Sequence, residues 1–284
     1  MVEGTEVSLA RCVMLAFVCV NLLVSWGSAW SAPEKGVFPE IAGRIVYERP
    51  DGIYLQQTGS SSAERIVPGG AYPRWSPDGK VVAYVQAHAI GIISLVDRRQ
   101  VILAQAAFPH AVAFHPGGEM IWFTDGDEIK AVNWKTCAIV SIVKGKKYRE
   151  LDVSEHVLAV TVHGLGFHVE TMNLDTRESK WIARGCSASL SPSGDRVTVN
   201  GGGHTRLDIY DISNGKRLAQ VDAPPGNTFD NQFWSNAQDW VVSVVEKGGQ
   251  DVYIHQISTN RSWRVTSSGD CNRPDLYLDV SRKR

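Results

Sequence analysis

The sequence predicts an all-β fold, a six-bladed β-propeller, from three observations. Residues 74–85 read RWSPDGKVVAYV, which combines a short extended run, a Ser-Pro-Asp-Gly turn and an apolar strand, and weaker copies follow at intervals of about 40 residues. Each period contains four short strand-like segments joined by Gly, Asn, Asp and Ser, as hairpin turns require. No stretch of the mature region keeps a helical period over about 11 residues. Four strands in a repeat of this length are typical of a propeller blade.

A large apolar residue precedes the turn in each copy and marks the blade. These six markers are Trp75, Phe114, Val153, Leu190, Trp234 and Leu276. Their nearly even spacing predicts six blades. The strands of the first blade are expected over residues 71–76, 81–87, 90–96 and 100–105. The third blade is assigned from spacing alone, because its turn has shrunk to SEH.

One blade is expected to be shared by the two ends of the propeller. The last marker lies in RPDLYLDV (273–280), a first strand without the three that should follow. Residues 43–70 contain GRIVYERP, GIYLQQ and ERIVPGG, three strands without a first. Pairing these segments closes the ring and removes two exposed strand edges. An open array or a sandwich is the alternative.

The Trp-Ser-Pro-Asp-Gly string has a structural explanation. Pro77 fixes φ in the turn, Gly79 allows a positive φ, and Asp78 can accept hydrogen bonds from turn amides. Trp75 is expected to pack between neighbouring blades.

The strings PRWSPDGKVVAYV and SWRVTSSGDCNRPDLYL resemble the repeats of the TolB-like family of six-bladed β-propellers. Residues 75–79 match the family's turn fully, and residues 191–194 and 234–235 match it in part. The resemblance covers about residues 43–282 and implies a fold rather than a chemistry, since such propellers also occur in peptidases and lyases. TolB itself carries an additional N-terminal domain, for which we expect no room in this chain.

Length and charge favour a single domain that does not bind nucleic acids. The chain has 284 residues, of which 43% are hydrophobic, which is enough for one large core. The formal net charge is −1 with both signs interspersed, so no nucleic-acid partner is expected.

The N-terminal segment predicts export. Residues 12–26 form an apolar run that is short for a transmembrane helix, and small residues follow it. We expect a signal peptide, or a signal anchor, over 1–29, a linker over 30–42 and the propeller over 43–282. The expected location is the periplasm or the exterior, with no membrane contact after cleavage.

Motifs for metals, cofactors and hydrolytic catalysis are missing from the sequence. No Cys-x-x-Cys pair, Gly-x-Ser-x-Gly elbow or phosphate loop occurs, so no metal or cofactor is expected. Cys186 and Cys271 belong to blades expected to be too far apart for a disulfide. His163 and His168 flank a hairpin and are expected to be able to approach each other, without a third ligand. The glycines before His204 are interpreted as a flexible strand connection.

The loops that lead into the first strands are expected to gather around one mouth of the central channel. They carry Tyr72, His110, Arg149, Glu150, Cys186, Asp230, Asn231, Asn272 and Arg273. All of these except Cys186 form the predicted partner-binding site, because a polar, concave ring suits a peptide or a sugar.

Three functions remain open. The first is a non-enzymatic propeller that binds a protein or peptide in the cell envelope, and the resemblance to TolB implies a peptidoglycan-associated or outer-membrane protein as partner. The second is a carbohydrate-active lyase or hydrolase that uses His and Arg residues of the mouth, for which metal binding at His163 or His110 would be the indicator. The third is a carbohydrate-binding propeller with Trp and Tyr as stacking surfaces.

Overall fold

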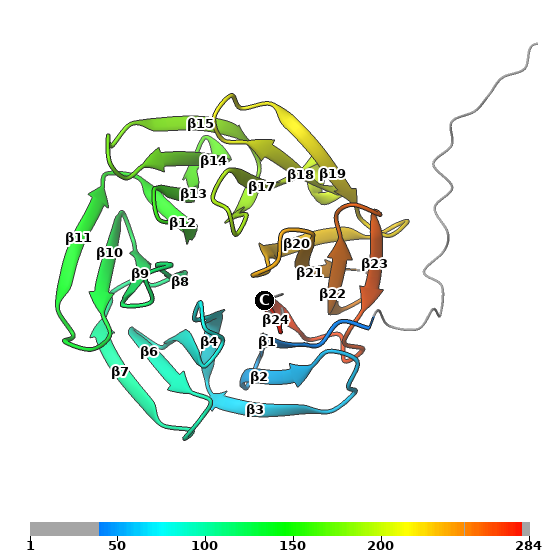
Figure 1. Ribbon diagram of the computed structural model, residues 1–284, viewed down its shortest axis with the longest axis horizontal. Helices are drawn as coiled ribbons and strands as arrows, with labels where there is room; N and C mark the ends of the chain where they lie inside the picture. Colours follow the sequence, from blue (N-terminus) through cyan, green and yellow to red (C-terminus); the bar gives the residue numbers. More distant parts are fainter. Residues whose placement is uncertain (1–39, 247, 280–284) are drawn as a thin grey trace, which may run out of the picture. The chain divides into compact units, whose positions relative to one another are not determined.

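The computed structural model describes residues 40–246 and 248–279, which form a six-bladed β-propeller (Figure 1). The predicted fold class is confirmed. The predicted signal peptide or anchor over 1–29, most of the predicted linker and residues 280–282 lie outside the described residues. Within the described ranges, no helix is long and apolar enough to cross a membrane.

Blades 1 to 3 each consist of four antiparallel strands, which follow one another along the chain from the channel outward. Blade 1 contains β4 (Gly70–Trp75), β5 (Val81–Gln86), β6 (Ala89–Ser94) and β7 (Gln100–Gln105). Blade 2 contains β8 (Val112–Phe114), β9 (Met120–Asp125), β10 (Glu128–Asn133) and β11 (Ile139–Lys144). Blade 3 contains β12 (Lys147–Val153), β13 (Val157–Gly164), β14 (Gly166–Asn173) and β15 (Ser179–Arg184). The blade assigned from spacing alone is therefore complete.

Blades 4 to 6 have the same arrangement from the channel outward. Blade 4 contains β16 (Cys186–Leu190), β17 (Arg196–Gly201), β18 (Arg206–Asp211) and β19 (Arg217–Asp222), with a 3-10 turn η1 (Gly202–His204) before β18. Blade 5 contains β20 (Thr228–Trp234), β21 (Trp240–Glu246), β22 (Gln250–Gln256) and β23 (Arg261–Arg264). Blade 6 contains β24 (Asn272–Leu278), β1 (Gly43–Arg49), β2 (Gly52–Gln57) and β3 (Ala63–Pro68).

The ring is closed by strands from the two ends of the described chain. β24 pairs antiparallel with β1, in the register that places Gly43 opposite Leu278. Each inner strand contacts the inner strands of both neighbouring blades, and β24 contacts β4. The closure expected from the sequence is confirmed.

The apolar core is divided into six clusters, one between each pair of neighbouring blades. This corrects the expectation of one large core. Each blade buries both faces of its sheet against its neighbours, and the channel keeps opposite blades apart. Trp75, for example, packs with Val46 and Ile53 of blade 6 and with Val82 of its own blade.

The markers and the turn behave as expected. None of the six markers is more than 8% exposed. In the turn after Trp75, Lys80 N donates to Asp78 Oδ1 over 3.1 Å, and Gly79 has a φ of +67°. A Cβ at Gly79 would lie 2.5 Å from the Tyr277 ring, so a glycine is required there.

A hydrogen bond between blades recurs one residue before the marker. Asp152 accepts from the backbone N–H of Leu190 (2.9 Å), which is the marker of the next blade. In the same way Ser189 accepts from Trp234 N–H (2.9 Å) and Asp275 accepts from Trp75 N–H (2.8 Å). The second of these links joins blades 4 and 5, and the last joins the closing blade to blade 1. These side chains fix the inner strands to one another around the channel.

Candidate binding site at the channel mouth

The inner strands share an irregularity near the mouth where they begin. In five blades their pairing with the second strand skips two residues, which are 72–73, 149–150, 187–188, 231–232 and 273–274. Each skip is a β-bulge, which bends the strand and redirects its side chains.

Four of these bulges hold a residue in the left-handed region three positions before the marker. Tyr72, Ser187, Asn231 and Arg273 have φ between +43° and +58°. Such a backbone conformation costs a non-glycine residue on the order of 1–3 kcal/mol and is concentrated at ligand-binding sites in proteins. The strain therefore lies where the sequence predicts a binding ring.

The structure brings all eight predicted site residues together, largely through contacts between neighbouring blades. The Arg273 guanidinium lies over the Tyr72 ring at 4.1 Å, joining blades 6 and 1. Arg149 Nη1 donates to His110 Nε2 over 2.9 Å, joining blades 3 and 2. The remaining contacts are Asn231 Nδ2 to Asn272 Oδ1 (2.7 Å), Asn231 to Asp230 Oδ2 (3.0 Å) and Ser187 N to Glu150 Oε2 (3.3 Å). All eight side chains are half-buried or buried.

Two carboxyl groups of the ring are desolvated. Burial raises the pKa of Glu150, and the charge of Asp230 acts in the same direction. Burial also raises the pKa of Asp230, and the charge of Glu246 adds to this effect. The pKa of His110 is lowered by burial and by the charges of Arg149 and Arg273, which fits a neutral ring that accepts from Arg149. A cationic or hydrogen-bond-donating ligand is therefore favoured beside the carboxyl groups.

Glu48 and His204 also belong to the mouth and were missed by the sequence analysis. Glu48, from β1, accepts from Tyr72 N–H (2.9 Å) and from the Arg273 guanidinium. His204, in η1, lies with Nε2 3.8 Å from Cys186 Sγ. The stretch interpreted as a flexible strand connection forms the 3-10 turn η1. The run of glycines before His204 is the sequence signal for this turn, because glycines readily adopt the positive φ values found there.

The expected approach of His163 and His168 is wrong. In the β13–β14 hairpin, His163 lies opposite Phe167 and His168 lies opposite Val162. Successive residues of a strand point to opposite faces, so the two imidazoles face apart. His163 instead stacks on Phe167 at 4.6 Å, and His168 Nε2 lies 2.8 Å from Glu170 Oε1.

The same hairpin extends the mouth with apolar side chains. β13 and β14 have eight residues each, more than any other described strand. Leu165 at the tip is fully exposed, and Phe167 is 45% exposed. Phe108, in the loop that leads into β8 of the adjacent blade, is 66% exposed. An apolar border thus lies on the mouth side of blades 2 and 3.

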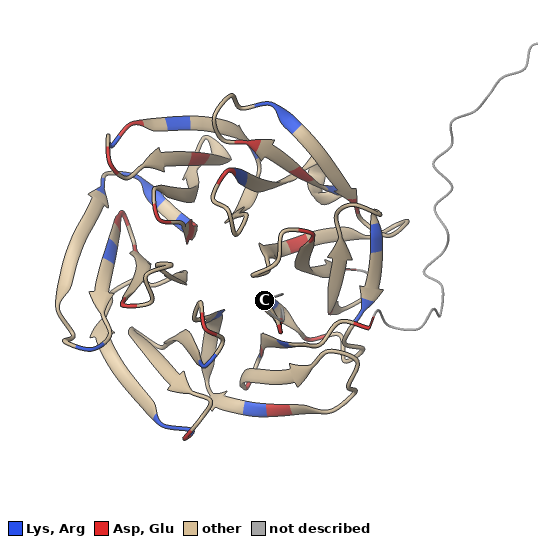
Figure 2. Cartoon of the chain, in the orientation of Figure 1, with Lys and Arg blue, Asp and Glu red and all other residues tan. Residues whose placement is uncertain are grey.

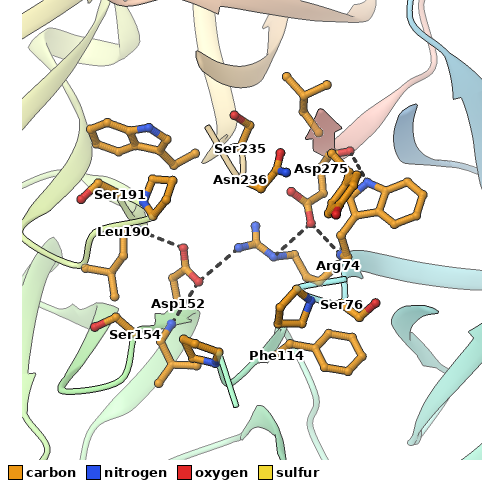
Figure 3. Close-up of a pocket in the computed structure, with 18 residues that line it drawn as sticks. Arg74, Ser76, Phe114, Asp152, Ser154, Leu190, Ser191, Ser235, Asn236 and Asp275 are labelled. Carbon is orange, nitrogen blue, oxygen red and sulfur yellow. Dashed lines mark hydrogen bonds and ion pairs between the residues drawn. The ribbon is translucent and has the colours of Figure 1, made fainter. Parts of the chain in front are cut away.

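The opposite end of the channel is crossed by an ion pair (Figure 3). Arg74 of blade 1 extends between Asp152 of blade 3 (3.3 Å) and Asp275 of blade 6 (3.7 Å), and its guanidinium also lies 4.0 Å from the Phe233 ring. A cavity of about 230 Å³ lies beside this ion pair, lined by the markers and the turns that follow them. The two ends therefore differ in chemistry: a strained polar ring at one, a bridged arginine at the other.

Known proteins share this fold without sharing much sequence. No protein-family model matches the chain, and no curated protein sequence matches it. Among solved structures, TolB from Acinetobacter baumannii is similar with a TM-score of 0.68 and 17% identity, over 82% of this chain and 66% of that chain. The chain thus shares the propeller fold of this TolB. This chain therefore spans about two thirds of the A. baumannii TolB chain.

Two further structures are covered over nearly their whole length. A nidogen/laminin complex gives a TM-score of 0.69 and 12% identity, over 84% of this chain and 99% of that chain. A putative TolB from Agrobacterium tumefaciens gives a TM-score of 0.61 and 11% identity, over 85% of this chain and 99% of that chain. These TM-scores establish a common fold, and the low identities carry no statement about function.

Proposed function

We propose that this chain is an exported, non-enzymatic β-propeller that binds an extended peptide segment of a protein partner in the cell envelope, through the mouth of its channel. The observation that carries the proposal is the ring of bulged inner strands. The same strained position recurs at Tyr72, Asn231 and Arg273 in three different blades, and each of these side chains contacts another polar side chain of the mouth. Strain kept at equivalent places is typical of a binding site.

The composition of the mouth suits a peptide. Asn231, Asn272 and Arg273 supply donors and acceptors for main-chain amides, and Glu150 and Asp230 supply buried acceptors. Lys and Arg residues are interspersed with Asp and Glu residues around the propeller rather than gathered at one side of it (Figure 2).

The apolar border favours a protein over a sugar. Leu165, Phe167 and Phe108 are exposed on the mouth side of blades 2 and 3, and exposed apolar side chains commonly anchor protein partners. Among the eight predicted ring residues the only aromatic side chain besides the His110 imidazole is Tyr72, and one face of its ring is covered by Arg273. A sugar would therefore find little free stacking surface on these residues.

Two comparisons support the proposal. The nidogen propeller was solved in complex with laminin, a protein. The TolB neighbours agree with the family resemblance, which implies an envelope partner. Export follows from the apolar segment at 12–26.

The test compares two double variants of the full chain in pull-downs from an envelope extract. Arg149→Ala/Arg273→Ala removes two cations from the mouth, and Lys80→Ala/Lys135→Ala removes two exposed cations from the opposite face. A retained protein should bind the control like wild type and the mouth variant at least about tenfold more weakly, which corresponds to about 1.4 kcal/mol. A synthetic peptide from that protein should compete with it for binding, and the variant Leu165→Asp should retain the protein more weakly than wild type does. Retention that is equal in both double variants would reject this face.

A further inference from the structure

Three metal-binding side chains from distant parts of the sequence converge beside the mouth. Cys186 begins β16, His204 ends η1 and Asp230 lies in β20. Cys186 Sγ, a His204 ring nitrogen and an Asp230 carboxylate oxygen all lie within 4.8 Å of one another. We propose that these three residues bind one divalent transition-metal ion, with Zn²⁺ as the best fit.

The distance between the sulfur and nitrogen donors is close to that of a zinc site, and the carboxylate oxygen lies within 4.8 Å of both. Zinc lies about 2.3 Å from a thiolate sulfur and about 2.0–2.1 Å from an imidazole nitrogen in tetrahedral geometry, which separates the two donor atoms by about 3.6 Å. Cys186 Sγ and His204 Nε2 are 3.8 Å apart. Small side-chain movements are enough to seat the ion. The three donors leave one tetrahedral position for water.

The histidine is held in the orientation that a ligand needs. His204 Nδ1 lies 3.1 Å from the Phe229 carbonyl oxygen, which fixes the proton on Nδ1 and leaves the Nε2 lone pair directed at Cys186. Gly202, Gly203 and His204 itself have φ between +59° and +68°, so three consecutive left-handed residues hold the ring in place.

The carboxylate is oriented as well. Asp230 Oδ1 accepts from Asn231 N–H (2.9 Å), and Oδ2 accepts from Asn231 Nδ2 (3.0 Å). β20 therefore supplies one ligand, Asp230, together with the groups on either side of it that orient both Asp230 and His204. Hydrogen bonds that orient a ligating side chain in this way are characteristic of metal sites.

The donor set selects the metal and argues against a cysteine nucleophile. Thiolate with imidazole and carboxylate suits Zn²⁺ rather than Mg²⁺ or Ca²⁺, which prefer oxygen. In a nucleophilic Cys-His pair, an acidic group commonly binds the outer nitrogen of the histidine. In this chain the outer nitrogen faces a carbonyl, and Asp230 lies on the sulfur side. Three donors that face a common point are the arrangement of a cation site.

The test is a metal titration of the reduced, chelator-treated full chain. Co²⁺ should bind with one equivalent and give a sulfur-to-cobalt charge-transfer band, which Zn²⁺ should abolish by displacement. Cys186→Ser should remove the band, and His204→Ala and Asp230→Asn should each weaken Zn²⁺ binding by about 100-fold or more. Cys137→Ser, at an exposed free cysteine of blade 2, and His163→Ala should change neither result.

Several results would overturn the site. These are a wild-type chain without the band, a band that persists in Cys186→Ser, or a band that disappears in Cys137→Ser. Thermal unfolding of each variant shows whether it is folded, and Asp230→Asn keeps the shape of its side chain if His204→Ala unfolds. Metal binding is measured without a partner, so its outcome and that of the pull-down are independent.

Discussion

Asp275→Asn should change how the stability of the propeller depends on pH. Asp275 is buried at the end of the channel opposite the mouth, where it accepts from Trp75 N–H and lies 3.7 Å from Arg74 Nε. Burial raises its pKa from 3.8 to about 6, although the charge of Arg74 opposes this effect. The folded state therefore holds the proton more tightly than the unfolded chain does.

The direction and the size of the change in stability follow from the difference between the folded and the unfolded pKa of Asp275. Between the unfolded and the folded pKa, the unfolded chain is ionised while the folded state is still protonated, so the stability due to Asp275 falls as pH rises. A pKa difference of about 2 units corresponds to about 3 kcal/mol once the pH is well above the folded value. About 2 kcal/mol of this loss falls between about pH 4.5 and about pH 8. Asparagine does not titrate, so the variant escapes the loss.

The assay is urea unfolding of the full chain at these two pH values. The free energy of unfolding of Asp275→Asn, relative to wild type, should rise by about 2 kcal/mol from about pH 4.5 to about pH 8. Asp195→Asn is the control, because a hydrogen bond from Ser193 lowers the pKa of Asp195, so that this carboxyl is ionised in both the folded and the unfolded state at the two pH values and the stability of the variant relative to wild type should stay nearly constant between them. A relative stability of Asp275→Asn that stays constant, or falls, with pH would refute the reasoning.

Three further outcomes are expected. Gly79→Ala should be less stable than Gly118→Ala by about 1–3 kcal/mol in urea unfolding. Both glycines have a positive φ, but only a methyl group at position 79 would meet a neighbouring side chain, the Tyr277 ring. Equal losses of stability in the two variants would contradict this. Trp75→Ala should cost about 3–5 kcal/mol, since it empties the space between blades 6 and 1, and a loss below about 1 kcal/mol would count against that packing. His255 lies between the hydroxyl groups of two serines, and burial lowers its pKa to about 3. The NMR resonances of its imidazole should therefore not shift between about pH 5 and about pH 8. A titration midpoint within that range would contradict its burial.

The sequence predicts the fold well because its information is periodic. The markers recur in every blade, and even Val153, where the turn has shrunk, lies at the right place in a complete sheet. The pairing of β24 with β1 was predictable because the C-terminal segment has only the first strand of a blade and the segment over 43–70 has only the other three. The ring residues were predictable as positions, since the start of every inner strand has to face the channel mouth.

The details of the site were not predictable from local patterns. The left-handed bulge residues are Tyr, Ser, Asn and Arg, which share no backbone preference, so the strain comes from the closed ring rather than from the residue type. The contact of Cys186 with His204 depends on a turn whose shape the glycines permit but do not specify. Glu48 reaches the mouth from a second strand, outside the set of positions that the repeat singles out.

The pairing of β24 with β1 has a consequence for synthesis of the protein. β24 is translated after every other described strand, so β1 leaves the ribosome long before its partner exists. Until then, β1 is an unpaired edge and the apolar side chains that β24 later covers are exposed. Closing so long a loop also slows the last step of folding. The last strand to be synthesised is therefore the one that completes both the hydrogen-bonded ring and the apolar cluster between blades 5 and 6.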